Sequence, residues 1–345
     1  MRIAHIAPVA TTIPPPKSGS VETMTSLLTE GLVARGVDVT LFATGDSTTR
    51  AKLHAIYPHG YWHDENMWPW ELYEMLNLAA AVERARDFDL IHYEAAYYPM
   101  SLAFARLSPT PIVQTLHNSP SQAEFRLWSR YPEAPFVAIS NEQAQLLDGL
   151  NIVATVLHGI DTDNFLFNEK PDDYLLFLGR FTEGKGVLQA IEIAKRVGMK
   201  LILAAAADDY YREKVAPHVD GRHIIYYGEA SFEEKVKLYG GARALIYPIQ
   251  SREPFGLVLA EAMACGTPVA ALDKGAVREV VDAGVTGVIY GDLEQMVNEL
   301  PRVFNLDRRR VRERAVARFG AARMVDEYIA VYRRIVEANR VRQRG

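Results

Sequence analysis

The sequence predicts an α/β protein built from two doubly wound domains. The chain has 345 residues, a length that suits two domains of ordinary size. Short β-rich apolar runs alternate with longer helix-like segments, and this alternation is typical of parallel sheets covered by helices. The alternation stops in a stretch at residues 157–173 that ends in a polar run, and then starts again. We therefore expect one domain on each side of that stretch.

The first series of elements starts at the N-terminus. Arg2–Ala7 is a predicted strand, Val21–Arg35 a predicted helix and Val37–Ala43 a second strand. Further strands are predicted at Asp89–His92, Pro111–Leu116 and Phe136–Ile139. These runs are continuously apolar, which indicates strands buried on both faces, as in a parallel sheet.

The second series repeats this pattern after the polar stretch. Strands are predicted at Tyr174–Leu178, Lys200–Ala205, His223–Tyr227, Ala244–Pro248 and Pro268–Ala271, with a helix at Gly186–Val197. We therefore predict an N-terminal domain at residues 1–160 and a C-terminal domain at 161–320. The last helical segment, residues 321–345, could cross back to the first domain.

The composition excludes several classes of protein. The apolar share of 49% and the charged share of 23% are those of an ordinary globular protein. A net charge of −5 argues against a nucleic-acid partner, and no apolar stretch approaches the roughly 18 residues that span a bilayer. The single cysteine, Cys265, allows no disulfide within the chain, which fits a reducing compartment. We expect a cytoplasmic protein.

Basic residues gather towards the C-terminus, at residues 307–312 and again from Arg333 to Arg344. We interpret both runs as solvated helix faces. Weak peripheral contact with an anionic membrane is the alternative.

A loop from Leu178 to Gly186 predicts an anion site. It runs from a strand end into a helix, and glycine there lets backbone amides approach an anion closely. Arg180 and Lys185 would place two cations around the same anion. Surface charge without a ligand is the alternative interpretation.

A second segment, Ser251–Val269, carries two glutamates around a predicted helix. Pro254 favours a helix start, so we expect a helix at Phe255–Cys265. The carboxylate of Glu253 would lie among the amides of residues 255–257, and Glu261 would need a partner if it is buried in this apolar helix. The alternative is that Glu253 only caps the helix and Glu261 faces water.

The two segments together resemble glycosyltransferase family 4. The family's pattern is two glutamates seven residues apart, with Phe-Gly-Leu between them and Gly-Thr-Pro-Val after them, and it matches Glu253–Val269. The Gly-Arg and Glu-Gly-Lys-Gly pieces of residues 179–186 match the family's phosphate loop, and His158–Phe165 resembles its interdomain segment. The resemblance runs from Met1 to beyond Gly287. It implies the GT-B fold, in which two Rossmann-like domains face each other across a cleft.

The resemblance assigns a donor site in the C-terminal domain. Arg180 and Lys185 would hold the donor diphosphate and stabilise the leaving group. Glu261 would accept hydrogen bonds from the ribose. Glu253 would bind the transferred sugar, helped by backbone amides of the donor residues Phe255, Gly256 and Leu257.

In the N-terminal domain the resemblance assigns two further residues. Gly19 would bring its backbone close to the donor phosphates, and His117 would act in catalysis by contacting the donor sugar or the acceptor hydroxyl. Relatives often have Gly-Gly at Gly19-Ser20 and Asn-Gly-Ile-Asp at His158–Asp161, so the details of donor geometry differ here.

The reaction implied is retaining transfer of a hexose from a nucleotide-diphosphate sugar to an acceptor hydroxyl on a carbohydrate or small molecule. UDP-sugar is favoured over GDP-mannose on family frequency. No Asp-X-Asp group stands at a predicted strand end, and two cations with helix amides can replace a metal ion, so we expect neither metal nor cofactor.

The acceptor site is predicted in the N-terminal domain. Its loop at residues 57–70 holds Trp62 and Trp68, and aromatic faces stack on sugar rings. Packing of this loop over the sheet is the alternative. Glu94 and Tyr97, which follow the strand at Asp89–His92, are further acceptor candidates.

Four other functions remain open. An epimerase or a glycan phosphorylase could share the fold, although phosphorylases need a pyridoxal lysine and are normally longer. A dinucleotide-dependent oxidoreductase is disfavoured because no Gly-X-Gly-X-X-Gly follows Arg2–Ala7. A non-catalytic nucleotide-binding module would have little use for the four charged donor residues.

Overall fold

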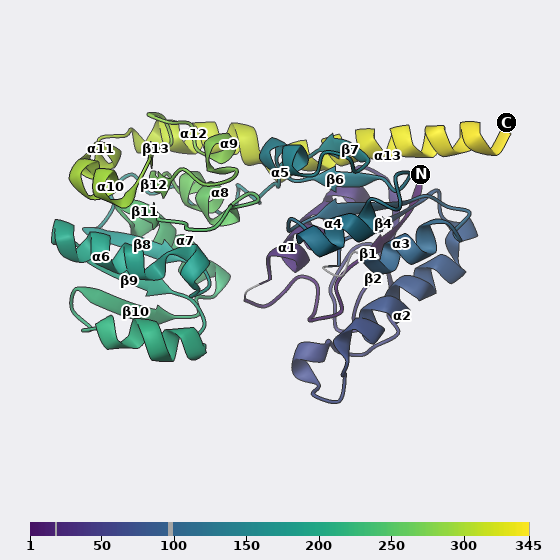
Figure 1. Ribbon diagram of the computed structural model, residues 1–345, viewed down its shortest axis with the longest axis horizontal. Coiled ribbons are helices and arrows are strands. Elements are labelled where there is room, and N and C mark those ends of the chain that lie inside the picture. Colours follow the sequence, from purple (N-terminus) through teal and green to yellow (C-terminus); the bar gives the residue numbers. More distant parts are fainter. Residues whose placement is uncertain (18, 96–98, 345) are drawn as a thin grey trace. The chain divides into compact units, whose positions relative to one another are not determined.

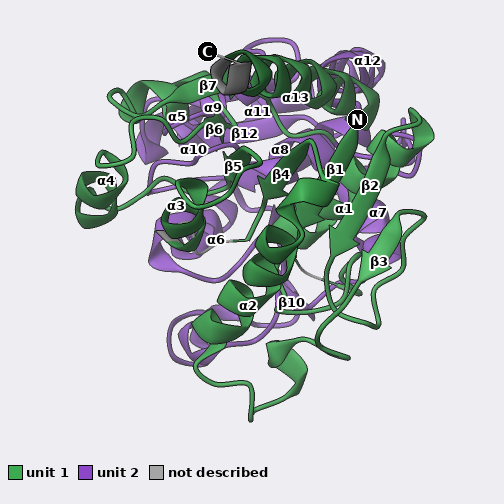
Figure 2. Ribbon diagram, turned by 90° about the vertical axis from the view of Figure 1, so that its right-hand side faces the viewer, with its two compact units in different colours: residues 1–159, 321–345 green, residues 160–320 purple. Residues whose placement is uncertain are grey.

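The computed structural model describes residues 1–17, 19–95 and 99–344 and divides the chain into two compact units. Unit 1 is Met1–Gly159 together with the chain from Ala321 onward, and unit 2 is Ile160–Gly320 (Figure 2). No helix in the described chain is both long and apolar enough to cross a bilayer.

Unit 1 is built on a seven-stranded parallel sheet with the order β3-β2-β1-β4-β5-β6-β7 (Figure 1). The strands are β1 (Arg2–Ile6), β2 (Asp38–Phe42), β3 (Lys52–His54), β4 (Leu90–Tyr93), β5 (Ile112–Leu116), β6 (Phe136–Ala138) and β7 (Ile152–Thr155). The two edge strands β3 and β7 were not predicted. They are three and four residues long and less buried than the central strands, with β3 mostly exposed and β7 half-buried.

Helices cover this sheet. They are α1 (Ser20–Ala34), α2 (Trp70–Glu83), α3 (Pro99–Ala105), α4 (Gln122–Trp128), α5 (Asn141–Leu146) and α13 (Ala321–Arg344), with short 3-10 turns at Tyr61–His63 and Ala85–Asp87. The C-terminal helix α13 packs on α1. A Cβ at Gly31 would lie 2.4 Å from the Val325 Cγ2 atom, so the two helices approach at a position where only glycine fits.

Unit 2 repeats the architecture with a six-stranded parallel sheet of order β10-β9-β8-β11-β12-β13. The strands are β8 (Tyr174–Leu178), β9 (Lys200–Ala204), β10 (Ile224–Gly228), β11 (Ala244–Tyr247), β12 (Val269–Leu272) and β13 (Gly287–Tyr290). The helices are α6 (Val187–Val197), α7 (Phe232–Gly241), α8 (Leu257–Ala264), α9 (Val277–Val280), α10 (Leu293–Glu299), α11 (Pro301–Phe304) and α12 (Arg308–Phe319). Short turns of 3-10 or π type lie at Glu183–Lys185, Tyr211–Val215 and Ala216–His218.

Both sheets confirm the doubly wound α/β class, and each has one point where the strand order reverses. In unit 1 the chain leaves β1 towards β2 on one side and later adds β4 on the other, and in unit 2 β8 lies between β9 and β11 in the same way. Ligands of open parallel sheets bind at the carboxyl ends of the strands beside such a point. The fold therefore directs attention to the loops after β1, β4, β8 and β11.

The basic run at residues 307–312 is not simply a solvated face. Arg308 is buried and donates to the carbonyls of residues 168, 240 and 242 and to the Thr267 hydroxyl. Arg312 donates to three further carbonyls, those of residues 162, 165 and 264. These arginines anchor α12 to neighbouring loops because buried carbonyls without other donors need partners. Within this run the prediction of a solvated face is correct for Arg309 and Arg310, which are exposed, and in the second run it is correct for Arg333, Arg334 and Arg340.

Candidate active site

The loop after β8 is held by contacts with the loop after β11. Gly186 has φ 76°, and a Cβ there would lie 2.0 Å from the Pro248 carbonyl oxygen, so glycine is required at the start of α6. The Gly184 carbonyl accepts hydrogen bonds from the amides of Gln250 at 2.8 Å and Ser251 at 3.1 Å. The conformation of the candidate phosphate loop is therefore fixed by contacts between the loops that follow β8 and β11.

Lys185, Tyr247 and Glu253 form a cluster at these two strand ends. The Lys185 Nζ atom lies 2.5 Å from Glu253 Oε2 and 3.4 Å from the Tyr247 hydroxyl. The same Oε2 accepts a hydrogen bond from Tyr247. Burial, together with the charge of Glu253, raises the pKa of Tyr247 well above its usual value, so its hydroxyl keeps its proton. The cluster thus pairs a partly exposed cation with a buried carboxylate.

This geometry corrects the predicted placement of Glu253. Its carboxylate binds Lys185 and Tyr247 rather than the amides of residues 255–257, because a buried carboxylate gains most from a nearby cation. Its backbone is held against a tight turn: the Ala276 amide donates to the Glu253 carbonyl at 2.8 Å. A Cβ at Gly275 would lie 2.4 Å from that same carbonyl oxygen.

Helix α8 begins at Leu257, two residues later than predicted, because Gly256 takes a left-handed conformation with φ 90° and forms the N-cap. Phe255 is buried and packs against Phe319, with ring centroids 5.9 Å apart, so its side chain belongs to the core. Gly256 and Leu257 stand at the amino end of α8, where helix amides point outward.

Glu261 lies one turn from the end of α8, and a tyrosine on a neighbouring helix holds it. The hydroxyl of Tyr239, a buried residue of α7, donates to Glu261 Oε2 at 2.7 Å. Burial and the charge of Glu261 raise the pKa of Tyr239 well above its usual value. Glu261 is half-buried. The expectation that it needs a partner is met, and the alternative of a carboxylate facing only water is wrong.

Arg180 lies two residues after the end of β8 and is exposed. Within the described residues it forms no ion pair or hydrogen bond, so its guanidinium is held by no acidic side chain there. A cation in this position at a strand end can meet an anionic ligand at little cost in broken contacts.

In unit 1, Gly19 and His117 also lie at the carboxyl ends of strands. Gly19 has φ 145° and is the N-cap of α1, and a Cβ there would lie 2.8 Å from Glu22 Oε2. His117 directly follows β5. Burial raises the pKa of Glu22, although a hydrogen bond from its own backbone amide and the charge of the nearby His117 both act to lower it. The first turn of α1 therefore holds a buried carboxylate directly beside Gly19.

The acceptor candidates have different environments. Glu94 is buried with 1% of its surface exposed, and its Oε2 lies 2.6 Å from His117 Nε2, so its prediction as an acceptor contact is wrong. Trp62 and Trp68 are 58% and 72% exposed, which contradicts the packing of their side chains over the sheet. Tyr97 lies outside the described residues.

Several functional neighbours were not predicted from the sequence. Tyr247 and Tyr239 contact Glu253 and Glu261, and His5 and His92 surround Glu94. Tyr247 and His92 had a usable signal, since each is a polar side chain at the carboxyl end of a predicted strand. Tyr239 and His5 lie inside elements that look like ordinary core.

A buried acid in unit 1 provides a pH-dependent prediction. Glu74 of α2 is 2% exposed and accepts hydrogen bonds from the Val9 amide and the Tyr61 hydroxyl. Burial raises its pKa to about 8. The folded chain therefore keeps this carboxyl protonated while the unfolded chain ionises it, so its contribution to stability is complete below about pH 4.5 and is lost as pH rises through about 8.

We accordingly expect Glu74→Gln to stabilise the chain by about 5 kcal/mol at pH 9 and by almost nothing at pH 4, since the pKa rises from 4.5 to about 8 and each pKa unit is worth about 1.4 kcal/mol. Urea unfolding at the two pH values measures this. Glu83→Gln, an exposed position on the same helix, is the control and should change neither value. A destabilised Glu74→Gln at pH 9 would contradict the assignment.

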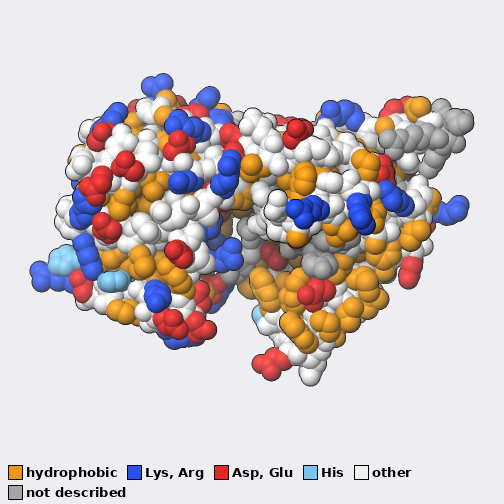
Figure 3. Space-filling view, viewed as in Figure 1, with side chains coloured by type: hydrophobic (Ala, Val, Ile, Leu, Met, Phe, Trp, Pro, Cys, Tyr) orange, Lys and Arg blue, Asp and Glu red, His pale blue; other side chains and the backbone are white. Residues whose placement is uncertain are grey.

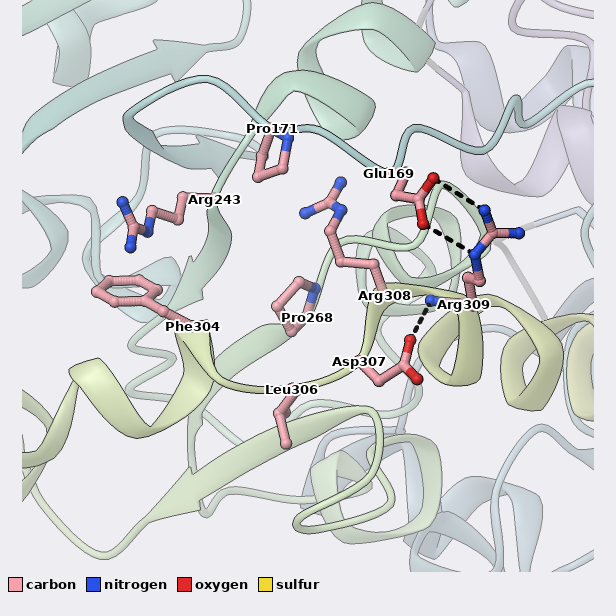
Figure 4. A pocket seen from close by; sticks show the side chains of 9 residues that line it. All are labelled: Glu169, Pro171, Arg243, Pro268, Phe304, Leu306, Asp307, Arg308 and Arg309. Carbon is pink, nitrogen blue, oxygen red and sulfur yellow. Dashed lines mark hydrogen bonds and ion pairs between the residues drawn. The ribbon is translucent and has the colours of Figure 1, made fainter.

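A pocket of about 310 Å³ in unit 2 lies elsewhere (Figure 4). It is lined by Glu169, Pro171, Arg243, Pro268, Phe304, Leu306, Asp307, Arg308 and Arg309. Arg243 and Pro268 directly precede β11 and β12, so the pocket is at the amino ends of these strands, opposite the end where ligands of such sheets bind. Backbone carbonyls occupy most of the donors of Arg308, and we do not assign the pocket to the donor site.

Comparison with known families agrees with this geometry. Residues 21–164 match the model described as Glycosyltransferase Family 4, and residues 161–318 match the one described as Glycosyl transferases group 1. An uncharacterized glycosyltransferase of Methanocaldococcus jannaschii is 23% identical over 329 residues, which are 82% of this chain and 84% of the relative.

Two solved structures share the fold. AviGT4, a glycosyltransferase involved in avilamycin A biosynthesis, is 23% identical with a TM-score of 0.74, and the match covers 98% of both chains. The Anabaena protein HepE, in complex with UDP and glucose, is 17% identical with a TM-score of 0.73 over 96% of this chain and 98% of its own. The chain described here therefore belongs to glycosyltransferase family 4 and has the GT-B fold of two Rossmann-like domains.

Proposed function

We propose that this glycosyltransferase moves a hexose, with retention of configuration, from a nucleotide-diphosphate sugar to an acceptor hydroxyl. The observation that carries the proposal is the grouping of Lys185, Glu253 and Tyr247 at the ends of β8 and β11. Exposed Arg180 follows the same β8. Together these residues offer two cations for a diphosphate and a carboxylate for sugar hydroxyls.

In this proposal each donor residue has one task. Arg180 and Lys185 stabilise the negative charge that develops on the leaving diphosphate, and the amides of Gly256 and Leu257 at the start of α8 bind the donor. Glu253 exchanges part of its contact with Lys185 for hydroxyls of the sugar. Glu261, held by Tyr239, accepts hydrogen bonds from the ribose.

The reaction needs no covalent enzyme intermediate. The bond between the anomeric carbon and the phosphate oxygen breaks, the acceptor oxygen bonds to the same face of that carbon, and the acceptor proton passes to the departing phosphate oxygen. His117 contacts the sugar or the acceptor hydroxyl. We propose that no metal ion takes part, since Arg180, Lys185 and helix amides supply the positive charge that a metal would bring.

We favour a UDP-sugar as donor, with GDP-mannose next. The structural relative from Anabaena was solved with UDP and glucose, which supports a uridine nucleotide without deciding it for this chain. The test is thermal shift against UDP, GDP, ADP and their sugars, each with and without EDTA, because a ligand that binds only the folded state raises the melting temperature.

We expect one nucleotide class to raise the melting temperature by several degrees with EDTA present, and Lys185→Ala to remove the shift. A shift that EDTA abolishes and Mg²⁺ or Mn²⁺ restores would contradict metal independence. No shift with any nucleotide would contradict the proposed function, and a shift by NADH alone would favour an oxidoreductase.

The acceptor site is proposed in unit 1, around the exposed Trp62 and Trp68. Exposed apolar side chains gather over the neighbouring α2, where Leu72 and Leu76 lie one turn apart (Figure 3). Exposed aromatic faces next to such a surface suit a ring-bearing acceptor.

We expect Trp68→Ala to raise the Michaelis constant for the acceptor about fivefold, because an aromatic contact is worth on the order of 1 kcal/mol, and to leave the melting temperature unchanged. Steady-state kinetics with varied acceptor measures the effect. Leu107→Ala, another strongly exposed apolar position, is the control. A lower melting temperature with an unchanged Michaelis constant would instead support a packing role.

A further inference from the structure

A buried carboxylate, Glu94, has histidines on both of its oxygens. Glu94 Oε1 lies 3.1 Å from His5 Nε2 and 3.4 Å from His92 Nε2, and Oε2 lies 2.6 Å from His117 Nε2. All four side chains are buried. Burial would raise the pKa of Glu94, but the three histidines together hold it well below its usual value, so the carboxylate is ionised.

Hydroxyl groups also contact the Nδ1 atoms of His5 and His92, on the side of each ring opposite Nε2. Thr29 of α1 contacts His5 Nδ1 at 2.7 Å, and Tyr332 of α13 contacts His92 Nδ1 at 2.7 Å. His92 Nε2 also lies 2.8 Å from the Thr115 hydroxyl. Burial lowers the pKa of His92 to about 3, so its ring is neutral, with one nitrogen as donor and the other as acceptor.

The same atoms are poorly arranged for a metal ion. His5, His92 and Glu94 have ligand atoms within 4.8 Å of one another. However, the rings of His5 and His92 are stacked at 4.9 Å between centroids with an angle of only 8°. The lone pair of an imidazole lies in the plane of the ring, so two parallel rings cannot both direct it at one ion between them. The contacts instead form a hydrogen-bond network that converges on Glu94.

We propose that Glu94 is the positioning residue for His117 and that His5 and His92 hold it in place. The contact with Glu94 commits His117 Nε2 as a hydrogen-bond donor and fixes the plane of the imidazole directly after β5. This inference rests on the proposed function, in which His117 meets the sugar or the acceptor. It adds that the orientation of His117 is set by residues of β1, β4 and α1.

The test combines NMR spectroscopy and kinetics on the full-length protein labelled with ¹⁵N-histidine. The His117 ring signals are assigned by their absence in His117→Gln. In the wild type we expect an Nε2–H proton at low field that is protected from exchange with water, and we expect Glu94→Gln to remove it. The turnover number should fall about 10- to 100-fold in Glu94→Gln, while the Michaelis constant for the donor changes less than threefold, because misplacing a reacting group costs rate more than binding.

Two further variants keep the proposal falsifiable. Gln114→Met changes a buried polar residue of β5 whose side-chain oxygen has no hydrogen-bond partner among the described residues, and it should leave the His117 signal and turnover unchanged. Thr29→Val removes only the hydroxyl that contacts His5 Nδ1, and it should lower the turnover number less than Glu94→Gln does. This variant tests the proposal if Glu94→Gln fails to fold.

A His117 signal that survives in folded Glu94→Gln, or equal losses of turnover in Gln114→Met and Glu94→Gln, would overturn the proposal. If Glu94→Gln does not fold, an unchanged turnover in Thr29→Val overturns it. If the wild type transfers no sugar from any nucleotide, the proposed function fails, and the NMR signal alone still decides whether Glu94 positions His117.

Discussion

Lys185→Met is expected to lower kcat/KM for sugar transfer about 10³-fold, which is the usual scale for removing one group that stabilises developing negative charge. Among the residues that the structure describes, the same change leaves the buried Glu253 carboxylate with only the Tyr247 hydroxyl as a partner. Breaking a buried ion pair is costly, and since Lys185 is partly exposed we expect a loss of about 2 kcal/mol in stability. Activity and stability must therefore be measured together.

A double variant separates the two effects. Lys185→Met with Glu253→Gln removes the unpaired charge, so it should recover most of the stability and none of the activity. Lys195→Met, an exposed lysine of the following helix α6, is the control and should behave as wild type. More than a tenth of wild-type activity in folded Lys185→Met would show that Lys185 does not stabilise the leaving group.

Glu261→Ala is expected to weaken binding of the nucleoside diphosphate about 10- to 100-fold, because hydrogen bonds to a charged group are worth about 1.5–3 kcal/mol. Calorimetry with the nucleotide selected by the thermal-shift panel measures this. The ribose is tested directly by comparing that nucleotide with its 2′-deoxy form. The wild type should bind the ribose form about tenfold more tightly than the 2′-deoxy form, and Glu261→Ala should bind both equally. In a double-mutant cycle, this loss of preference is the sign of a direct contact between Glu261 and the 2′-hydroxyl.

Tyr239→Phe is the control for this experiment. It removes the hydroxyl that holds Glu261 and keeps the carboxylate, so binding should weaken less than threefold. Glu261→Ala also leaves the buried Tyr239 hydroxyl without its acceptor, and combining it with Tyr239→Phe should restore stability without restoring affinity. A preference for ribose that persists in Glu261→Ala would place the hydroxyls elsewhere.

The sequence predicted the central strands of both sheets because apolar residues make up most of each of these strands. It did not reveal β3, β7 or β13, which are short edge strands with partly exposed residues. It placed the start of α8 two residues early, because proline favours a helix start and only the backbone shows that Gly256 turns left-handed first. The preference of a segment for helix or strand can be predicted from its residue types, whereas edge strands and helix caps depend on the segments that pack around them.

The glutamates likewise show that sequence position was predictable and that the partner in the fold was not. The positions of Glu253 and Glu261 around a helix, and of Lys185 in a glycine-bearing loop, were readable because strand ends and helix starts follow from local patterns. Their partners were not, since Tyr247 and Tyr239 come from other elements. Glu94 was predicted as an acceptor candidate after the strand Asp89–His92 and is instead enclosed by three histidines from β1, β4 and the end of β5.

By itself, then, the sequence determined the α/β class, the repetition of the doubly wound pattern and the residues at the strand ends of unit 2 that suit an anionic donor. These properties follow from hydrophobic period and from the preferences of glycine, proline and charged side chains. Only the tertiary structure decided which charges are buried, which partner each one takes and how His117 is held. Burial and pairing depend on side chains that are distant in sequence, and the energy of a charged group is set by those neighbours and by the water they exclude.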